Sequence, residues 1–84
     1  MEREHALKMN SGRVVGARQT LRRIAMGQVQ AVYVAQDAQD ALIEPVLHEC
    51  TNKGIPVIFV ETMAELGQMC GIAVGAACAA QLRS

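Results

Sequence analysis

The residues best suited to chemistry follow a pair of valines, where Gly16 opens a predicted helix. If residues 17–28 turn by about 100° each, Arg18, Gln19 and Arg22 share one face of that helix. Arginine and glutamine are well suited to hydrogen-bond phosphates and the edges of guanine and adenine. The glycine lets another backbone approach the free N–H groups at the helix start. The pattern therefore predicts an element that contacts RNA.

A solvated helix surface is the alternative interpretation of this polar face, which also includes Arg23. Two features favour a binding role: the glycine at the strand-to-helix turn, and the use of arginine rather than lysine. The opposite arc is apolar and is predicted to face the core; it contains Ala17, Leu21, Ile24 and Ala25.

Charge is distributed unevenly along the chain, although the formal net charge is zero. Residues 1–30 hold six of the eight basic residues and two acidic ones, whereas residues 31–84 hold two basic and six acidic ones. The first segment therefore has four excess positive charges and the second has four excess negative charges. This asymmetry predicts a basic face for an anionic partner and an acidic, solvated remainder.

Size and composition favour a small globular protein, and we expect a single domain over residues 1–84. Tyr33 and Phe59 are the only aromatic residues, which disfavours the stacking surfaces of many single-strand-binding folds. The polar N-terminal residues do not fit a signal peptide, and no apolar run reaches the ~20 residues of a membrane helix. We therefore expect a cytoplasmic protein with no membrane partner.

The three cysteines are expected to be buried thiols, because their number is odd and no Cys-x-x-Cys pair occurs. His48 and Cys50 are two residues apart, which is poor spacing for metal ligands on a helix. We expect His48 to be exposed, Cys50 to lie in the core, and the protein to hold no metal or cofactor.

Predicted strands and helices alternate, which favours an α/β sandwich with helices on both faces of a small sheet. The last segment, residues 76–82, fits either a strand or a helix. The preceding elements are a helix at 2–9, a strand at 13–15, a helix at 17–26, a strand at 31–35, a helix ending at 52–54, a strand at 57–60 and a helix ending at 69.

Two of these helices have terminal signals. Pro45 fits only a first turn, so the third helix is predicted to begin near Ile43 rather than directly after Asp40. Gly54 is its predicted stop. Residues 62–65, Thr-Met-Ala-Glu, fit a capping box at the start of the next helix.

Two separated motifs resemble those of a known family. The first runs from Gly16 to Thr20 and includes Arg22, and the second is ELGQMCGIAVGAA at 65–77. Between them lie VYVAQDAQ, a helix and Gly-Ile-Pro-Val at 54–57. In this order they are similar to the kink-turn RNA-binding ribosomal-protein superfamily, the L-seven-Ae and L-thirty-e group, and to its small bacterial members. The resemblance extends from about residue 7 to residue 82.

The resemblance implies a three-layer α-β-α sandwich around a mixed four-stranded sheet. Members of this group bind a sharply bent RNA internal loop with tandem sheared G·A pairs, and they do so without catalysis. On this mapping Gly16 permits close approach, while Arg18 and Gln19 read guanine edges. Arg22 holds a base or a phosphate.

The second motif is expected to supply an apolar cover for an extruded nucleotide, formed by Ile72, Ala73 and Val74. This chain departs from its relatives at two places. Archaeal members typically have Asn-Glu where it has Arg18-Gln19, and many members have an acid at the position of Ala73. The first departure affects which RNA loop sequence is preferred. Because of the second departure, the protein loop at residues 72–74 is expected to contribute to binding through its shape.

The resemblance thus implies a non-catalytic, ribosome-associated RNA-binding protein, with ribosomal RNA or another bent RNA rather than DNA as partner. A monomer is expected because the sequence offers no obvious spare apolar face. The sequence leaves two other classes open. A small α/β enzyme or receiver-like domain would use Asp37 and Asp40, although turn and helix-capping roles are favoured because no nucleophile or phosphate loop accompanies them. The other class is a protein-interaction module, or a relative of the substrate-binding domain of an RNA-modifying enzyme.

Three glycines four residues apart, Gly67, Gly71 and Gly75, resemble a small-residue packing ladder. That motif acts mainly in membranes. Here it is interpreted as a helix stop at Gly71 followed by a flexible loop.

Overall fold

Four strands form one mixed sheet in the computed structural model, which describes residues 12–83. The strand order is β1-β4-β2-β3, with β4 antiparallel to both β1 and β2 and with β3 parallel to β2. Residues 76–82 therefore end in a strand, whereas the helix predicted at 2–9 lies outside the described residues. The strands are β1 (Arg13–Val15), β2 (Val29–Ala35), β3 (Val57–Val60) and β4 (Cys78–Leu82).

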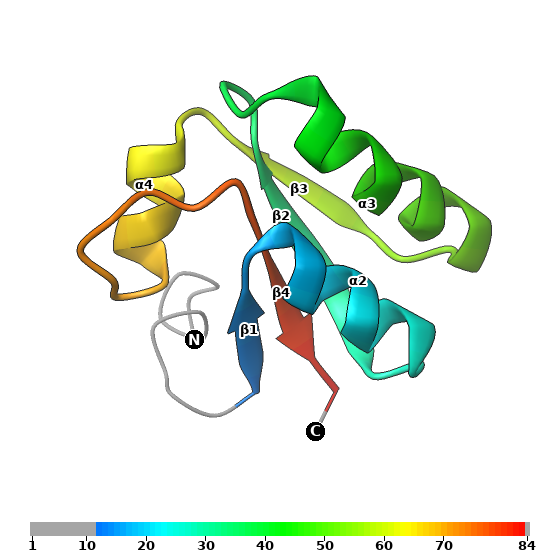
Figure 1. Cartoon of the computed structure of the whole chain (residues 1–84). Helices are drawn as coiled ribbons and strands as arrows, with labels where there is room; N and C mark the ends of the chain where they lie inside the picture. Colours follow the sequence, from blue (N-terminus) through cyan, green and yellow to red (C-terminus); the bar gives the residue numbers. More distant parts are fainter. Residues whose placement is uncertain (1–11, 84) are drawn as a thin grey trace.

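Helices cover both faces of the sheet (Figure 1). Helix α2 (Ala17–Ala25) and helix α3 (Asp40–Lys53) contact each other on one face. Helix α4 (Met63–Met69) lies on the other side, where it contacts β2, β3 and β4. The predicted fold class, an α/β sandwich around a mixed four-stranded sheet, is confirmed.

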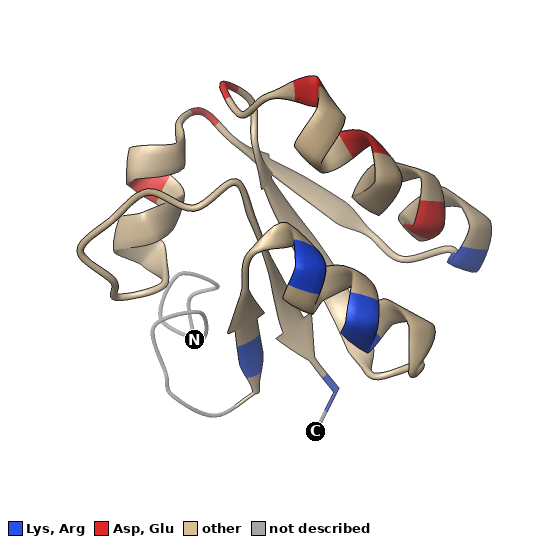
Figure 2. Cartoon of the chain, in the orientation of Figure 1, with Lys and Arg blue, Asp and Glu red and all other residues tan. Residues whose placement is uncertain are grey.

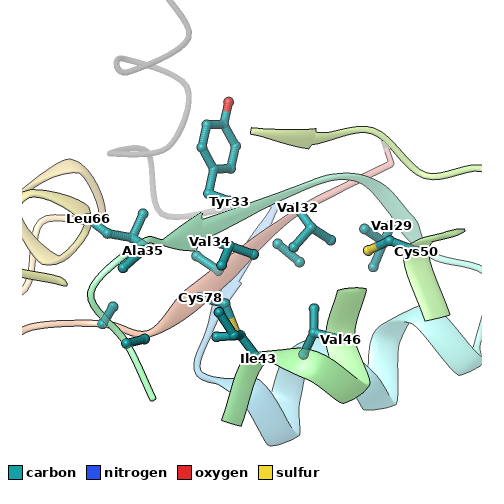
Figure 3. Close-up of a cluster of buried hydrophobic side chains, with 14 of the residues drawn as sticks. Val29, Val32, Tyr33, Val34, Ala35, Ile43, Val46, Cys50, Leu66 and Cys78 are labelled. Atoms are coloured by element: carbon teal, nitrogen blue, oxygen red, sulfur yellow. The ribbon is translucent and has the colours of Figure 1, made fainter. Parts of the chain in front are cut away.

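The core is built around β2, whose side chains alternate between the two faces. Val32 and Val34 point toward Ile43 and Val46 of α3, whereas Tyr33 points to the opposite face (Figure 3). All five side chains are buried. A strand buried on both faces must be apolar throughout, which explains the continuous run from Ala31 to Ala35.

The cysteines are part of this core, as predicted. Cys50, Cys70 and Cys78 are free and buried, and His48 is exposed. Burial raises the pKa of the Cys50 thiol to about 11, so that thiol is protonated at neutral pH. Within residues 12–83 no cluster of three His, Cys, Asp or Glu side chains could hold a metal ion. In the same part of the chain, no helix has the length and apolar character needed to span a membrane.

Helix α3 begins at Asp40, so the prediction of a start near Ile43 was wrong. The N–H of Ile43 donates to the carbonyl of Gln39 at 3.4 Å, which closes a turn ahead of Pro45. Pro45 has no N–H for the carbonyl of Ala41, four residues earlier. Both residues are exposed, so water can satisfy that carbonyl without ending the helix.

The other helix signals have their predicted effect. Gly54 ends α3 in the left-handed conformation, with φ of 68°. The Thr62 hydroxyl accepts a hydrogen bond from the Glu65 N–H at 3.0 Å and caps α4. Strand β2 begins at Val29, earlier than predicted, because an irregularity between Val29 and Ala31 lets the strand extend past its apolar run.

Candidate functional site

The turn before α2 is built on Gly16. This residue has φ of 106° and ψ of 151°, a conformation that is essentially limited to glycine. Its N–H donates to the carbonyl of Cys78 at 2.8 Å, and its carbonyl accepts from the N–H of Thr20 at 3.0 Å. A Cβ built on Gly16 would meet no atom within 4 Å. The backbone thus requires glycine here, and the space in front of the turn is open.

Helix α2 exposes the predicted polar side chains and buries the stripe behind them. Arg18, Gln19 and Arg22 are exposed. Thr20 and Ile24, one helical turn apart, are buried against the sheet. Because the buried stripe fixes the rotation of the helix, all three polar side chains point away from the core.

Three neighbouring residues differ from the sequence prediction. Ala25, which was placed on the apolar arc, is exposed, and Thr20 takes a place in the buried stripe instead. The Thr20 hydroxyl accepts a hydrogen bond from the Cys78 thiol at 4.0 Å, which lets a polar residue be buried. Arg23 was placed on the exposed polar face, but its side chain is half-buried and donates to the Gln28 side-chain oxygen at 3.0 Å.

Most basic residues and most acidic residues lie on different elements of the fold (Figure 2). Basic residues lie on α2, on β1, near the C-terminal end and at the last residue of α3, Lys53, whereas acidic residues lie along the rest of α3, on α4 and on the turns before these two helices. Within the described residues, no carboxylate pairs with Arg18 or Arg22. The first turn of α2 also contains no acidic residue. These guanidinium groups are therefore available to an anionic partner.

The apolar loop follows α4 and lies partly on the core. Val74 is 70% exposed and Ala73 is exposed, as predicted. Ile72 is half-buried and packs against the core, so its predicted solvent-facing placement was wrong. Its N–H donates to the carbonyl of Gly67 at 3.0 Å, which turns this residue back toward α4.

The start of α2 and the loop are attached to the same end of β4 (Figure 1). The N–H of Gly16 is bonded to the carbonyl of Cys78, the first residue of β4. The carbonyl of Ala77, at the end of the loop, accepts from the N–H of Ala35 at 2.9 Å. Two segments that are far apart in sequence thus meet where β4 begins, at its first residue, Cys78, and at the residue directly before it, Ala77.

The aspartates after β2 have structural roles. A carboxylate oxygen of Asp37 accepts from the N–H of Met63 at 2.8 Å, so Asp37 joins Thr62 in capping α4. Asp40 is the first residue of α3. Both placements agree with the capping and turn roles that the sequence favours over a phosphoryl-transfer pocket.

The fold and this arrangement of a polar helix start and an apolar loop define a class of small α/β proteins, and the whole chain matches one family in that class. Residues 1–84 match the Ribosomal protein L7Ae/L30e/S12e/Gadd45 family, and the chain belongs to it. The resemblance found in the sequence is thereby confirmed.

Several relatives are similar along most of the chain. A protein named RNA-binding protein, from Caldanaerobacter subterraneus subsp. tengcongensis, is 47% identical over 70 residues, which are 83% of this chain and 85% of the relative. RNA-binding protein YbxF of Geobacillus stearothermophilus is 41% identical with the same coverage. Large ribosomal subunit protein eL8 of Halobacterium salinarum is 42% identical over 66 residues, 77% of this chain and 55% of that protein.

Solved structures show the same fold. A Giardia lamblia 15.5kD RNA binding protein has a TM-score of 0.86 at 23% identity, and the match covers 96% of this chain and 68% of that one. A protein of unknown function from Bacillus halodurans C has a TM-score of 0.84 at 21% identity, covering 96% and 84%.

Proposed function

We propose that this protein is a non-catalytic RNA-binding protein that recognises kink-turns, the sharply bent internal loops of structured RNA. The observation that carries the proposal is the exposure of Arg18, Gln19 and Arg22 within two turns of the open Gly16 turn, with no carboxylate paired to either arginine among the described residues. Membership of the family and the names of the relatives support it.

The start of α2 supplies the hydrogen-bonding part of the proposed site. Arg18 and Gln19 read guanine edges, and Arg22 holds a base or a phosphate. The unpaired N–H groups and the positive end of the helix dipole add attraction for phosphate. Gly16 lets the RNA backbone approach because nothing occupies the space where a side chain would stand.

The loop supplies the apolar part of the proposed site. The exposed side chain of Val74 covers an extruded nucleotide. Ala73 next to it has a small, uncharged side chain that leaves room for this contact. Ile72 supports this cover from beneath, because it packs against the core. The same three residues that the sequence singled out thus have two different roles.

The proposed setting is the cytoplasm, where the protein acts as a single domain and a monomer on ribosomal RNA or another RNA with such a bend. The similarity to a large ribosomal subunit protein supports a ribosomal partner. Co-sedimentation with ribosomal subunits, lost after ribonuclease treatment, is the expected result. An association that survives ribonuclease would favour the protein-interaction alternative.

A gel-shift series tests the function directly. A hairpin with a kink-turn is compared with a straight duplex of equal length, and the kinked RNA is expected to bind more tightly. The slope of log affinity against log salt is expected to be roughly −2 to −5, at about −0.9 per neutralised phosphate. Equal affinity for the two RNAs would overturn kink-turn recognition. An affinity that does not change with salt would overturn the hypothesis that a basic face binds the RNA.

A further inference from the structure

The three glycines spaced by four residues have different roles in the structure. Gly71 directly follows Cys70, the C-terminal cap of α4, and its φ of 76° ends the helix as predicted. Gly67 is different because it lies inside α4 and does not have a positive φ. A helix interior disfavours glycine by about 1 kcal/mol relative to alanine, so a glycine at this position needs another explanation.

Close packing explains Gly67. A Cβ built there would overlap the carbonyl oxygen of Val74 and would lie 3.1 Å from the carbonyl carbon of Val74 and 3.2 Å from the Cα of Gly75. All three neighbours are backbone atoms, so no change of rotamer can make room. Any side chain at Gly67 must therefore displace the loop backbone at residues 74–75.

Further contacts hold the same loop along α4. The N–H of Ile72 donates to the carbonyl of Gly67, and the N–H of Ala76 donates to the carbonyl of Met63, both at 3.0 Å. A Cβ on Gly75 would lie 3.2 Å from the Cβ of Met63, a tight contact. These contacts attach the backbone of the loop to α4 at residues 72, 74, 75 and 76.

Val74 combines a fixed backbone with a free side chain. Its carbonyl group lies directly against Gly67, whereas its side chain is 70% exposed. The position of this apolar side chain is consequently set by how closely the loop approaches α4. The distance between the loop and α4 can be this short only because Gly67 has no side chain.

We propose that Gly67 is a positioning residue for RNA recognition, because its lack of a side chain lets the Val74 backbone dock on α4 and places the Val74 side chain against the RNA. The inference rests on the function proposed above. Gly67 is buried and acts only through Val74.

A double-mutant cycle on binding to the kinked hairpin tests this role. Gly67→Ala is expected to weaken binding between about threefold and about twentyfold in the wild-type background. In a Val74→Ser background, the same change is expected to add no more than about a further twofold loss, because the contact that it displaces is already gone. Equal losses in the two backgrounds would overturn the proposal, since general destabilisation lowers both alike. An unchanged affinity for Gly67→Ala would also overturn it.

Two further measurements keep the result interpretable. Gly27→Ala is the matched control: Gly27 has open space around it and belongs to the turn after α2, so its loss of affinity is expected to be equal in both backgrounds. If Gly67→Ala does not fold, Gly75→Ala takes its place in the cycle, with a smaller loss expected because its tightest contact is a side-chain atom.

The position of the loop can also be measured without RNA. By NMR, Gly67→Ala is expected to shift the methyl resonances of Val74 and to leave those of buried Val29, on β2, unchanged. Unshifted Val74 methyls would contradict the inference even if the RNA preference holds. Shifted methyls in a protein with no preference for kinked RNA would instead mean that the proposed function is wrong.

Discussion

The start of α2 and the loop after α4 offer a partner opposite kinds of surface. The helix start presents two arginines and an amide from regular backbone, whereas the loop presents Ala73 and Val74 from irregular backbone. Hydrogen-bonding groups distinguish one base edge from another, while an apolar surface distinguishes shapes. The helix start is also set by local periodicity, but the loop is set by contacts with α4. Substitutions in the two regions should therefore have different effects on RNA binding and on stability.

The largest effect is expected at the helix start. Gln19→Ala or Arg22→Ala should weaken binding to the kinked hairpin by ~1–3 kcal/mol, because a positioned contact with a base edge is lost. The straight duplex should lose much less, and thermal stability should not change because both side chains are exposed. Lys53→Ala, at the far end of α3, is the control and should have little effect on either RNA. Equal losses on the two RNAs would mean that this helix does not read the bend.

The next effect concerns the backbone that supports those side chains. Gly16→Ala should lower the free energy of unfolding by ~1–3 kcal/mol, because alanine cannot readily adopt its φ and ψ. Gly27→Ala, at φ of 72°, should lower it by only ~1–2 kcal/mol, the usual penalty of the left-handed region. Urea unfolding measures both. A Gly16 variant as stable as the wild type would show that the turn does not need glycine.

A smaller effect is expected at the base of the loop region. Asp37→Ala should lower the free energy of unfolding by ~0.5–2 kcal/mol, because the N–H of Met63 loses its acceptor. Asp37→Asn keeps an acceptor oxygen and should retain most of that stability. Thermal melts of the two variants provide the comparison. If alanine and asparagine behave alike and both match the wild type, the carboxylate does not support α4.

The smallest stability effect is expected at the exposed tip of the loop. Val74→Ser should change the free energy of unfolding by less than ~0.5 kcal/mol, as for most surface substitutions, while it weakens binding to the kinked hairpin. Ile72→Ser should instead lower stability measurably, because its side chain packs against the core. Melting temperatures and gel shifts on the same samples separate the two. A large loss of stability for Val74→Ser would place it in the core.

The elements encoded by local rules could be predicted from the sequence. The capping box at Thr62 and the stop at Gly54 rely on hydrogen bonds between near neighbours, and both are present. The polar face of α2 follows from helical periodicity alone. Membership of the family was also recognisable from two short motifs, because one of them carries the helix start and the other carries the loop.

The features that sequence reasoning missed depend on tertiary contacts. Burial of Thr20 needs the Cys78 thiol, which is on the last strand. The half-buried state of Ile72 depends on how the loop folds back on α4. Gly67 carries no local signal that separates a packing role from a weak helix position, because the atoms that exclude a side chain belong to residues 74–75. The early start of α3, ahead of Pro45, was instead an error about local structure.

The order of the strands has a consequence for synthesis of the protein. Strand β4 is the last of the described strands in sequence, yet it lies between β1 and β2 and is the only strand that pairs with β1. While a ribosome is still making residues 78–82, β1 lacks the β4 partner and the N–H of Gly16 lacks the Cys78 carbonyl. The sheet therefore closes only after β4 has left the exit tunnel. A ribosome stalled before residue 78 therefore holds an incomplete sheet.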